Sequence, residues 1–210
     1  MKLIGICGFI GGGKDTVAEM LVKKDFIKES FARGVKDAVS AIFSWDRDLL
    51  EGSTQGSREW REKPDVYWSH RFGKDFSPRQ ALQLMGTEVG RSVYHPNLWV
   101  DALERRMNPT KNYVISDVRF PNEIRWISKL GGRVIRVKRG SDPVWFDEAV
   151  KTNIMNHTPS MATFPGAPHY SEWAWCGDMF IAETIDNNGT LEDLENAVDL
   201  IIKNTDPANF

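Results

Sequence analysis

The feature that most constrains the fold is a glycine-rich loop, GFIGGGKDT at residues 8–16. Residues 2–7, KLIGIC, form a short apolar run typical of a buried parallel strand. After the loop, residues 14–24 carry apolar side chains at helical spacing. The spacing Gly8-x4-Gly13-Lys14 matches GxxxxGK in the strand–loop–helix context that this motif requires. The pattern predicts a phosphate-binding loop, and the alternative is a tight glycine turn without a ligand.

Strands and helices alternate along the rest of the chain. Apolar runs predict strands at 26–31, 113–116, 133–137 and 180–185, and helical spacing predicts helices at 34–45, 78–93, 97–107 and 122–130. Thr190 and Asp193 resemble a capping box that opens a final helix. We therefore expect an α/β fold of the P-loop NTPase type, a mainly parallel sheet flanked by helices. Binding sites in such sheets lie beyond the carboxyl ends of the strands.

Two segments interrupt this alternation. Residues 46–76 are polar, loop-like and rich in arginine and aromatic residues, and residues 141–175 are rich in proline and aromatic residues. We expect one kinase-type domain over 1–210, with an inserted substrate-binding lobe at 46–107 and a lid-like insertion at 141–175.

Composition excludes several classes of protein. Apolar residues make up 41% and charged residues 27%, which is ordinary for a soluble protein. The net charge of -2 argues against a broad nucleic-acid surface. Cys7 and Cys176 match no metal-binding spacing. The N-terminal apolar run leads straight into the glycine loop and does not resemble a signal peptide, and no apolar stretch approaches the roughly 18–20 residues of a membrane span. We expect a cytoplasmic protein without a membrane partner.

The residues after the glycines carry the expected chemistry. Lys14 would reach the terminal phosphates of a nucleotide and neutralise charge during phosphoryl transfer. Asp15 stands where the motif usually has a serine or threonine that ligates Mg²⁺. Asp15 could hold the metal through water or orient the attacking group, with Thr16 supplying the hydroxyl. A simple interaction with the helix dipole is the alternative for Asp15.

A second pair of candidates follows the strand at 113–116. Asp117 suits an outer contact to the metal or to the acceptor, and Arg119 suits bidentate contact with a phosphate. A solvent-exposed ion pair between Arg119 and Glu123 is the alternative. With Lys14 and Asp15, these two residues complete the predicted catalytic set.

Six stretches, in this order, resemble those of the phage deoxynucleoside monophosphate kinases, a branch of the P-loop nucleoside monophosphate kinase superfamily. They are GFIGGGKDT, SFARGVKDA, SPRQALQLMGTEVGR followed by HPNLWV, VISDVRFPNE, HYSE and IDNNGTLEDL. The GKD form of the loop is characteristic of that branch and also occurs in animal phosphomevalonate kinases. The resemblance spans nearly the whole chain and is weakest at 46–76 and 141–168. It implies transfer of the γ-phosphoryl group of ATP to a deoxynucleoside 5′-monophosphate, with Mg²⁺.

Such a reaction needs a second phosphate-binding site for the acceptor, facing the first across a cleft that excludes water. Arg79 and Gln83 lie four residues apart and share a helical face. Arg79 can bind the monophosphate while Gln83 reads a base edge. Four aromatic residues could stack on a base, with packing as the alternative for each: Trp60, Tyr67, Trp68 and Trp99. Arg58 and Arg61 could bind the substrate or could equally be solvated charges. The predicted substrate-binding residues are Lys36, Arg58, Arg61, Arg79, Gln83, Glu88, Arg91 and Trp99.

Three further elements concern the nucleotide side. Lys138 and Arg139 follow a strand and could belong to a lid over ATP. The loop 187–189 resembles the family's adenine-side loop, and a plain turn is the alternative. His169 and Glu172 resemble an H-x-S-E element of the family, whose role does not follow from spacing. The predicted ATP-binding residues are Gly11, Gly12, Gly13, Lys14, Asp15, Thr16, Arg139, Asn187 and Gly189, with Asp15 and Thr16 as metal ligands.

Two other functions remain open. One is a kinase for another phosphorylated small molecule or for a modified base within DNA. The other is a non-catalytic ATP-binding module. Gln83 and the aromatic residues favour a small nucleotide, and the net charge disfavours a stable nucleic-acid complex. The sequence leaves base preference, exclusion of ribonucleotides and assembly, including a homodimer, undetermined.

Overall fold

A computed structural model describes residues 1–155 and 160–205, and it divides the chain into two compact units. The first, the sheet unit, comprises Met1–Ser30 and Met107–Phe210. The second, the helical unit, comprises Phe31–Arg106. The inserted lobe predicted from the sequence spans 46–107, whereas the helical unit in the structure already begins at Phe31.

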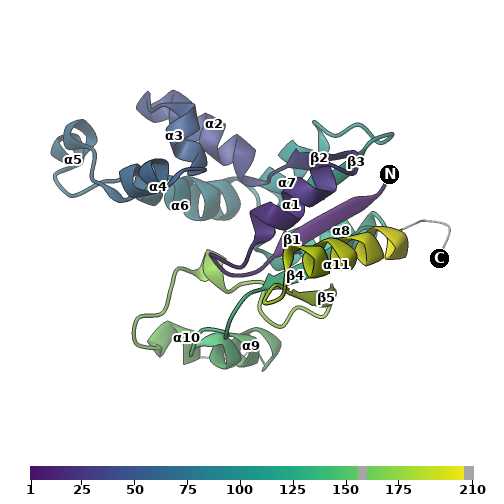
Figure 1. Ribbon diagram of the computed structural model, residues 1–210. Helices are drawn as coiled ribbons and strands as arrows, with labels where there is room; N and C mark the ends of the chain where they lie inside the picture. The colour runs from purple at the N-terminus through teal and green to yellow at the C-terminus, as the bar shows by residue number, and fades with distance from the viewer. Residues whose placement is uncertain (156–159, 206–210) are drawn as a thin grey trace. The chain divides into compact units, whose positions relative to one another are not determined.

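The sheet unit is built on five parallel strands in the order β2-β3-β1-β4-β5 (Figure 1). The strands are β1 (Leu3–Cys7), β2 (Phe26–Glu29), β3 (Asn112–Ile115), β4 (Arg133–Lys138) and β5 (Ile181–Asp186). The central strand β1 pairs with β3 on one side and β4 on the other, with Leu3 opposite Tyr113 and Ile4 opposite Arg133. The predicted α/β fold with a parallel sheet is confirmed, and each of the five predicted strands is present.

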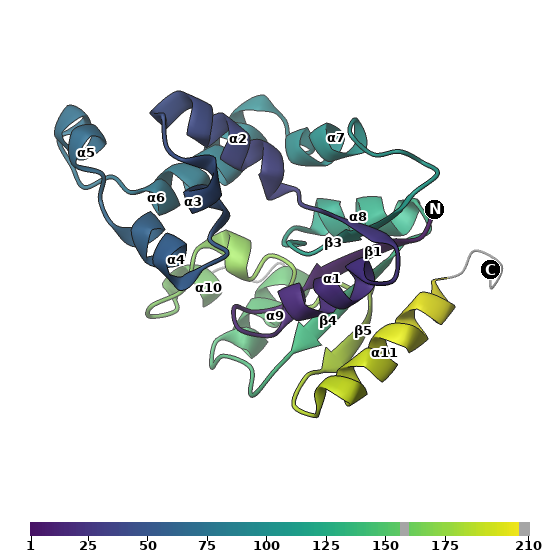
Figure 2. The same ribbon diagram turned by 45° about the horizontal axis from the view of Figure 1, so that its top comes forward.

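Helices cover both faces of this sheet because successive strand residues point to opposite sides. On one face lie α1 (Lys14–Val22) and α11 (Leu191–Asn204), and on the other lies α8 (Pro121–Lys129), as Figures 1 and 2 show. Ile4 and Ile6 of β1 join the apolar cluster with α1 and α11. Between them, a Cβ on Gly5 would meet Ile127 of α8 at 2.5 Å. The central strand is therefore buried on both faces, as a continuous apolar run predicts.

The segment between β4 and β5 contains helices of its own. These are α9 (Phe146–Met155), α10 (Ser160–Thr163) and the 3₁₀ turn η2 (Tyr170–Glu172). Part of the predicted lid-like insertion, residues 156–159, lies outside the described residues. Movement of this segment as a lid stays a prediction. The capping box at Thr190 and Asp193 that opens α11 is confirmed.

The helical unit consists of α2 (Ala32–Phe43), α3 (Arg47–Glu51), α4 (Gln55–Glu62), α5 (Val66–Phe72), α6 (Pro78–Gln83), the π-helix η1 (Leu84–Tyr94) and α7 (Leu98–Glu104). The prediction that 46–76 is loop-like is wrong, since α3, α4 and α5 occupy most of it. Each of these short helices is opened by a side-chain cap, from Asp46, Thr54 and Asp65. Aromatic rings pack between them: Phe43, Trp45, Trp60, Trp68, Phe72 and Phe76.

The predicted helix at 78–93 begins where expected but changes form. Ser77 caps it through a capping box with Gln80, and Pro78 occupies its first turn. From Leu84 onward the chain continues as a π-helix to Tyr94. Long π-helices are rare and often occur at functional sites. Among the described residues, no helix is both long enough and apolar enough to cross a membrane.

Candidate active site

The glycine loop between β1 and α1 adopts a backbone that requires glycine at several positions. Gly8, Gly11 and Gly13 have φ values of 135°, 80° and 97°, in the region that other residues rarely enter. A Cβ on Gly8 would lie 2.3 Å from the Val137 carbonyl oxygen, and one on Gly13 would lie 2.2 Å from Asn187 Nδ2. The loop is therefore held close against the ends of β4 and β5.

Lys14, the first residue of α1, folds over this loop. Its Nζ donates hydrogen bonds to the carbonyl oxygens of Gly8 at 2.9 Å and Phe9 at 2.8 Å. Burial and then the nearby charge of Arg119 lower the pKa of Lys14, while Asp15 and Glu172 act in the opposite direction. Two predicted catalytic cations, Lys14 and Arg119, are thus within electrostatic reach of each other.

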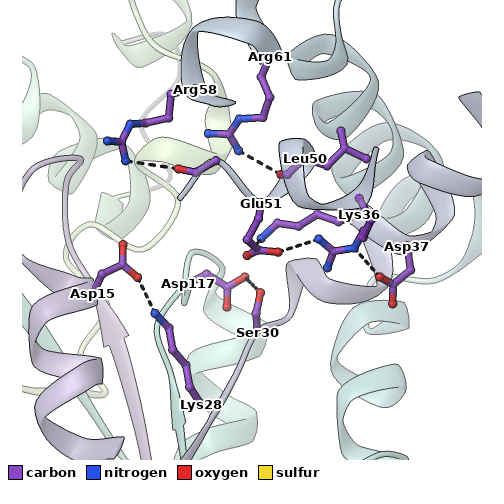
Figure 3. Close-up of polar contacts among 12 residues, drawn as sticks. Asp15, Lys28, Ser30, Lys36, Asp37, Leu50, Glu51, Arg58, Arg61 and Asp117 are labelled. Carbon is purple, nitrogen blue, oxygen red and sulfur yellow. Dashed lines mark hydrogen bonds and ion pairs between the residues drawn. The ribbon is translucent and has the colours of Figure 1, made fainter. Parts of the chain in front are cut away.

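Asp15 points outward from α1 towards β2. Its Oδ1 lies 3.0 Å from Lys28 Nζ (Figure 3), and the Asp15 side chain is 80% exposed. An exposed pair of this kind stabilises a fold by at most about 1 kcal/mol. Asp15 is therefore accessible to a ligand at the start of the helix. Thr16 lies in the same first turn and is half-buried.

Asp117 follows β3 and lies beside the end of the neighbouring strand β2. Ser30, the residue after β2, donates a hydrogen bond from Oγ to Asp117 Oδ2 at 2.7 Å (Figure 3). Because β2 and β3 are parallel neighbours, their carboxyl ends meet at one edge of the sheet. Sequence reasoning missed Ser30, although its place at the end of a predicted strand was a usable signal.

Arg119 is held by two glutamates in different ways. Glu123, which is 1% exposed, accepts hydrogen bonds through Oε2 from the backbone N–H groups of Arg119 at 2.7 Å and Phe120 at 3.0 Å. The Arg119 guanidinium instead forms an ion pair with Glu172, with 2.5 Å between Nη1 and Oε1. Glu123 therefore caps α8, and the alternative of an exposed Arg119–Glu123 ion pair is wrong.

A pocket of about 140 Å³ lies beside the loop. Its walls include Lys138 and the exposed Arg139, and Lys138 Nζ lies 3.3 Å from Asp142 Oδ2. The residues that line it are Phe9, Ile10, Gly12, Val137, Lys138, Arg139, Ser141, Asp142 and Pro143. The placement of Arg139 in this wall agrees with a position near the nucleotide side, and its contact with ATP stays a prediction.

An aromatic cluster that sequence reasoning missed anchors the loop to the segment after β4. Phe9 packs on Trp175 with ring centroids 4.9 Å apart and edge-on to Phe146 at 5.8 Å. The buried Arg136 guanidinium lies over the Phe146 ring at 4.5 Å and is paired with Asp142. Such cation–π contacts are worth about 2 kcal/mol when desolvated.

The loop after β5 supports the glycine loop from the other side. The side-chain amide of Asn187 donates to the Gly12 carbonyl at 3.0 Å, and its backbone N–H donates to Lys138 at 2.7 Å. Asn188 accepts from the Gly140 N–H at 2.8 Å. A Cβ on Gly189 would lie 2.7 Å from an Asp193 oxygen. The structure thus gives Asn187 and Gly189 a supporting role, and adenine contact stays a prediction.

In the helical unit, Lys36 is engaged by an acidic residue. Lys36 Nζ lies 2.5 Å from Glu51 Oε1, and Arg47 pairs with Glu51 Oε2 at 2.7 Å and with Asp37 at 2.6 Å (Figure 3). The Lys36–Glu51 and Arg47–Asp37 pairs therefore join α3 to α2, and the Arg47–Glu51 pair lies within α3. A substrate role for Lys36 stays a prediction and requires an anion to compete with Glu51.

Arg58, Arg61 and Arg79 form the more cationic part of this unit. Arg58 and Arg61 make long hydrogen bonds to the carbonyl oxygens of Gly52 at 3.3 Å and Leu50 at 3.5 Å. Arg61 Nε is buried and has no hydrogen-bond partner within the described part of the chain. Burial and then the charge of Arg79 lower the pKa of Arg61. The charge of Arg79 therefore acts on the Arg61 guanidinium, and binding of a substrate phosphate by these residues stays a prediction.

The remaining predicted substrate residues lie along α6, η1 and α7. Gln83 is half-buried where α6 joins η1, Glu88 is exposed, and Arg91 donates to the Pro96 carbonyl at 3.1 Å. Trp99 is only 7% exposed, and its indole N–H donates to the Gly86 carbonyl at 2.9 Å. This leaves little ring surface for a base, so the structure gives Trp99 a packing role in the helical unit.

Comparison with known proteins gives two relatives and no matching family model. The chain is 36% identical over 154 residues to a protein of Acanthamoeba polyphaga mimivirus named "Putative deoxynucleotide monophosphate kinase", covering 66% of this chain and 75% of that protein. The chain belongs to the viral deoxynucleotide monophosphate kinase family. It is also 28% identical over 176 residues to the deoxynucleoside-5′-monophosphate kinase of Escherichia phage T5, covering 58% of this chain and 69% of that one.

Solved structures resemble this family member more distantly. The crystal structure of TT1252 from Thermus thermophilus is 21% identical, with a TM-score of 0.41 and 97% of each chain covered. Dephospho-CoA kinase from Campylobacter jejuni is 12% identical, with a TM-score of 0.39 and the same coverage.

As a member of this family, the kinase is a nucleotide-binding phosphotransferase. Among the described residues, no three or more His, Cys, Asp or Glu side chains are grouped so that they could hold a metal ion. Mg²⁺, which is usual for such kinases, keeps several waters and binds one or two carboxylates together with substrate phosphates. Asp15 and Thr16 offer oxygen atoms in the first turn of α1, and Asp117 offers a carboxylate after β3.

Proposed function

We propose that this kinase transfers the γ-phosphoryl group of ATP to a deoxynucleoside 5′-monophosphate, giving the diphosphate and ADP. The observation that carries the proposal is the nearness of Lys14 and Arg119 at the carboxyl ends of parallel strands, beside a glycine loop built for an anion. The names of the two viral relatives support the choice of a deoxynucleotide as acceptor.

ATP would bind on the sheet unit. The glycine loop can direct its backbone N–H groups at the phosphates, and the N-terminus of α1 adds partial positive charge. Lys14 now donates to two loop carbonyls and can exchange these partners for phosphate oxygens without leaving the loop. Arg119 would stabilise the charge that spreads over the transferring group.

The monophosphate would bind on the helical unit. Arg61 and Arg79 supply two neighbouring cations, and a phosphate between them would relieve their repulsion. Further positive charge around this phosphate could come from Arg58, Arg91 and Lys36. Gln83 at the end of α6 and Glu88 in η1 could contact the base. Transfer requires the two phosphates to meet in line during the reaction, with water excluded.

The chain need not supply a strong general base. The second pKa of a phosphate monoester is about 6, so the attacking oxygen is largely ionised near neutral pH. Asp15, Thr16 and Asp117 would hold Mg²⁺, and Asp117 is kept in place by Ser30. When bound, Mg²⁺ would neutralise charge on the phosphates of ATP.

The test is an assay of ADP release with ATP, Mg²⁺ and each of dAMP, dGMP, dCMP and dTMP, run beside the four ribonucleotides. We expect turnover with at least one deoxynucleotide. Lys14→Ala should lower kcat by about 10²–10⁴-fold, the loss of a transition-state charge contact, with an unchanged melting temperature. Lys24→Ala, which removes a surface pair with Asp199, is the matched control.

Three outcomes separate the alternatives. Full activity of Lys14→Ala would contradict the proposal that Lys14 and the glycine loop act in phosphoryl transfer. Turnover of another phosphorylated small molecule, but of no nucleotide, would change the acceptor. Binding of ATP in a calorimeter, with no binding and no turnover of any deoxynucleotide, would favour the non-catalytic module.

A further inference from the structure

Glu172 is the one acidic side chain that contacts the guanidinium of Arg119 in the part of the chain that the structure describes. We propose that Glu172 is a positioning residue, which holds Arg119 in the orientation needed to meet the transferring phosphoryl group. The inference rests on the proposed function, because Arg119 has a catalytic role only there. Spacing in the sequence gives no role for Glu172, and neither relative's name assigns one.

The contact has the geometry of a positioning bond. Nη1 of Arg119 lies 2.5 Å from Oε1 of Glu172, and the two side chains are 36% and 16% exposed. The bond uses one of the three guanidinium nitrogens, and a guanidinium carries five N–H donors in a fixed fork. The Arg119 fork can therefore remain anchored at one nitrogen while another binds a phosphate oxygen.

Without Glu172, only the backbone of Arg119 would be fixed. Glu123 holds the backbone N–H groups of Arg119 and Phe120 at the start of α8 and leaves the arginine side chain free to rotate. An arginine side chain carries about 2 kcal/mol of rotamer entropy. Ordering that side chain before the reaction lowers the cost of ordering it in the transition state.

The backbone that carries Glu172 is held by hydrogen bonds from other side chains. The Trp175 indole N–H donates to the Glu172 carbonyl at 3.1 Å. The side-chain amide of Asn153, on α9, donates to the carbonyls of Trp173 at 3.0 Å and Cys176 at 2.8 Å. Because the Trp175 ring also packs on Phe9 of the glycine loop, one turn of the chain connects the loop with Arg119.

Charge supports the same role. Lys14 feels both Arg119, which lowers its pKa, and Glu172, which raises it. Glu172 thus offsets part of the repulsion between the two cations that the transferring group must meet. Its carboxylate therefore acts on Arg119 through the ion pair and on Lys14 through its charge.

The experiment is a double-mutant cycle on the full chain with Arg119→Ala, Glu172→Ala and the double variant. We expect Glu172→Ala to lower kcat about tenfold or more in the wild-type background and less than about twofold in the Arg119→Ala background. KM for the monophosphate should change little in either background. Glu172→Asp should recover part of kcat and Glu172→Gln should recover less, since the pair needs a charge.

The matched control is Glu183→Ala, which breaks the Arg133–Glu183 pair of 3.1 Å between β4 and β5. It should leave kcat unchanged. Equal losses from Glu172→Ala in both backgrounds would overturn the proposal and show that Glu172 acts without Arg119.

A second readout separates this inference from the proposed function. The four proteins of the cycle are titrated with ATP and Mg²⁺ in a calorimeter, where no acceptor is needed. We expect Glu172→Ala to weaken ATP binding in the wild-type background and not in the Arg119→Ala background. Should the wild-type protein turn over no monophosphate, the proposed function fails, and this binding cycle still supports or overturns the link between Glu172 and Arg119.

Discussion

Replacement of Gly13 by alanine tests the reasoning about the glycine loop most sharply. Gly13 has a φ of 97°, and an alanine Cβ there would lie 2.2 Å from Asn187 Nδ2. A left-handed backbone costs an alanine about 1–2 kcal/mol. Asn187 would also have to rotate away and lose its 3.0 Å hydrogen bond to Gly12, worth about 0.5–1.5 kcal/mol. The sum is about 1.5–3.5 kcal/mol.

Gly11→Ala is the matched control. Gly11 lies in the same loop with a φ of 80°, but a Cβ there would meet no atom within 4 Å. Its cost should be the backbone strain of about 1–2 kcal/mol alone. At roughly 2–4 °C per kcal/mol for a chain of this size, Gly13→Ala should lower Tm by roughly 3–14 °C and Gly11→Ala by roughly 2–8 °C.

The assay is thermal unfolding followed by circular dichroism for both variants, repeated in an Asn187→Ala background. There the cost of Gly13→Ala should fall to that of Gly11→Ala, because the amide that it displaces is gone. The reasoning is refuted if Gly13→Ala is no more destabilising than Gly11→Ala, or if its cost is the same with and without the Asn187 side chain.

Two further predictions concern the helical unit and the cysteines. Arg79→Ala should raise KM for the monophosphate about tenfold or more, because it removes a charged phosphate contact of about 1.5–3 kcal/mol. The control Arg71→Ala removes a cation–π contact with Tyr67 and should leave this KM unchanged. An effect of Arg79→Ala confined to the KM for ATP would contradict this assignment. Burial raises the pKa of the Cys7 thiol and raises that of Cys176 to about 12. The reactive thiolate forms only near and above the raised pKa. Iodoacetamide at pH 8 should therefore label both cysteines in urea and neither cysteine in the native protein. Rapid labelling of the native protein would contradict this prediction.

The parallel sheet could be predicted because its strands are marked in two ways. KLIGIC and YVIS are continuous apolar runs, and each is followed at once by residues suited to the end of a strand. Burial on both faces produces such runs, so the sequence pattern and the structure have one cause. The strand predicted at 26–31 ends two residues early, because Ser30 turns out of the sheet to bond Asp117.

The helices of 46–76 could not be recognised from periodicity. They are five, eight and seven residues long, too short for an apolar stripe to repeat. Their stability comes from side-chain caps and from aromatic rings that meet only in three dimensions, such as Trp45 stacking near Phe43 with centroids 4.7 Å apart. The caps at Asp46, Thr54 and Asp65 are the signal that the sequence offers for these helices.

The candidate site was predictable wherever its residues are close in sequence. The glycine loop with Lys14, and Asp117 with Arg119, each belong to one short motif. The missed contacts join distant segments. Glu172 meets Arg119 across 53 positions, and Ser30 meets Asp117 across 87. Such pairs depend on the order of the strands, which spacing along one chain does not give.

Although the net charge is only -2, each unit contains cationic side chains that lie near one another. In the sheet unit, burial and Arg119 lower the pKa of Lys14, and in the helical unit burial and Arg79 lower that of Arg61. Asp15 and Glu172 offset part of this effect on Lys14, and Glu62 and Glu51 offset part of it on Arg61, but the pKa of each cation stays below its usual value. A phosphate bound beside Lys14 or Arg61 would favour the charged form of that side chain. One cation of lowered pKa in each unit agrees with the two phosphate sites that we propose for transfer between a triphosphate and a monophosphate.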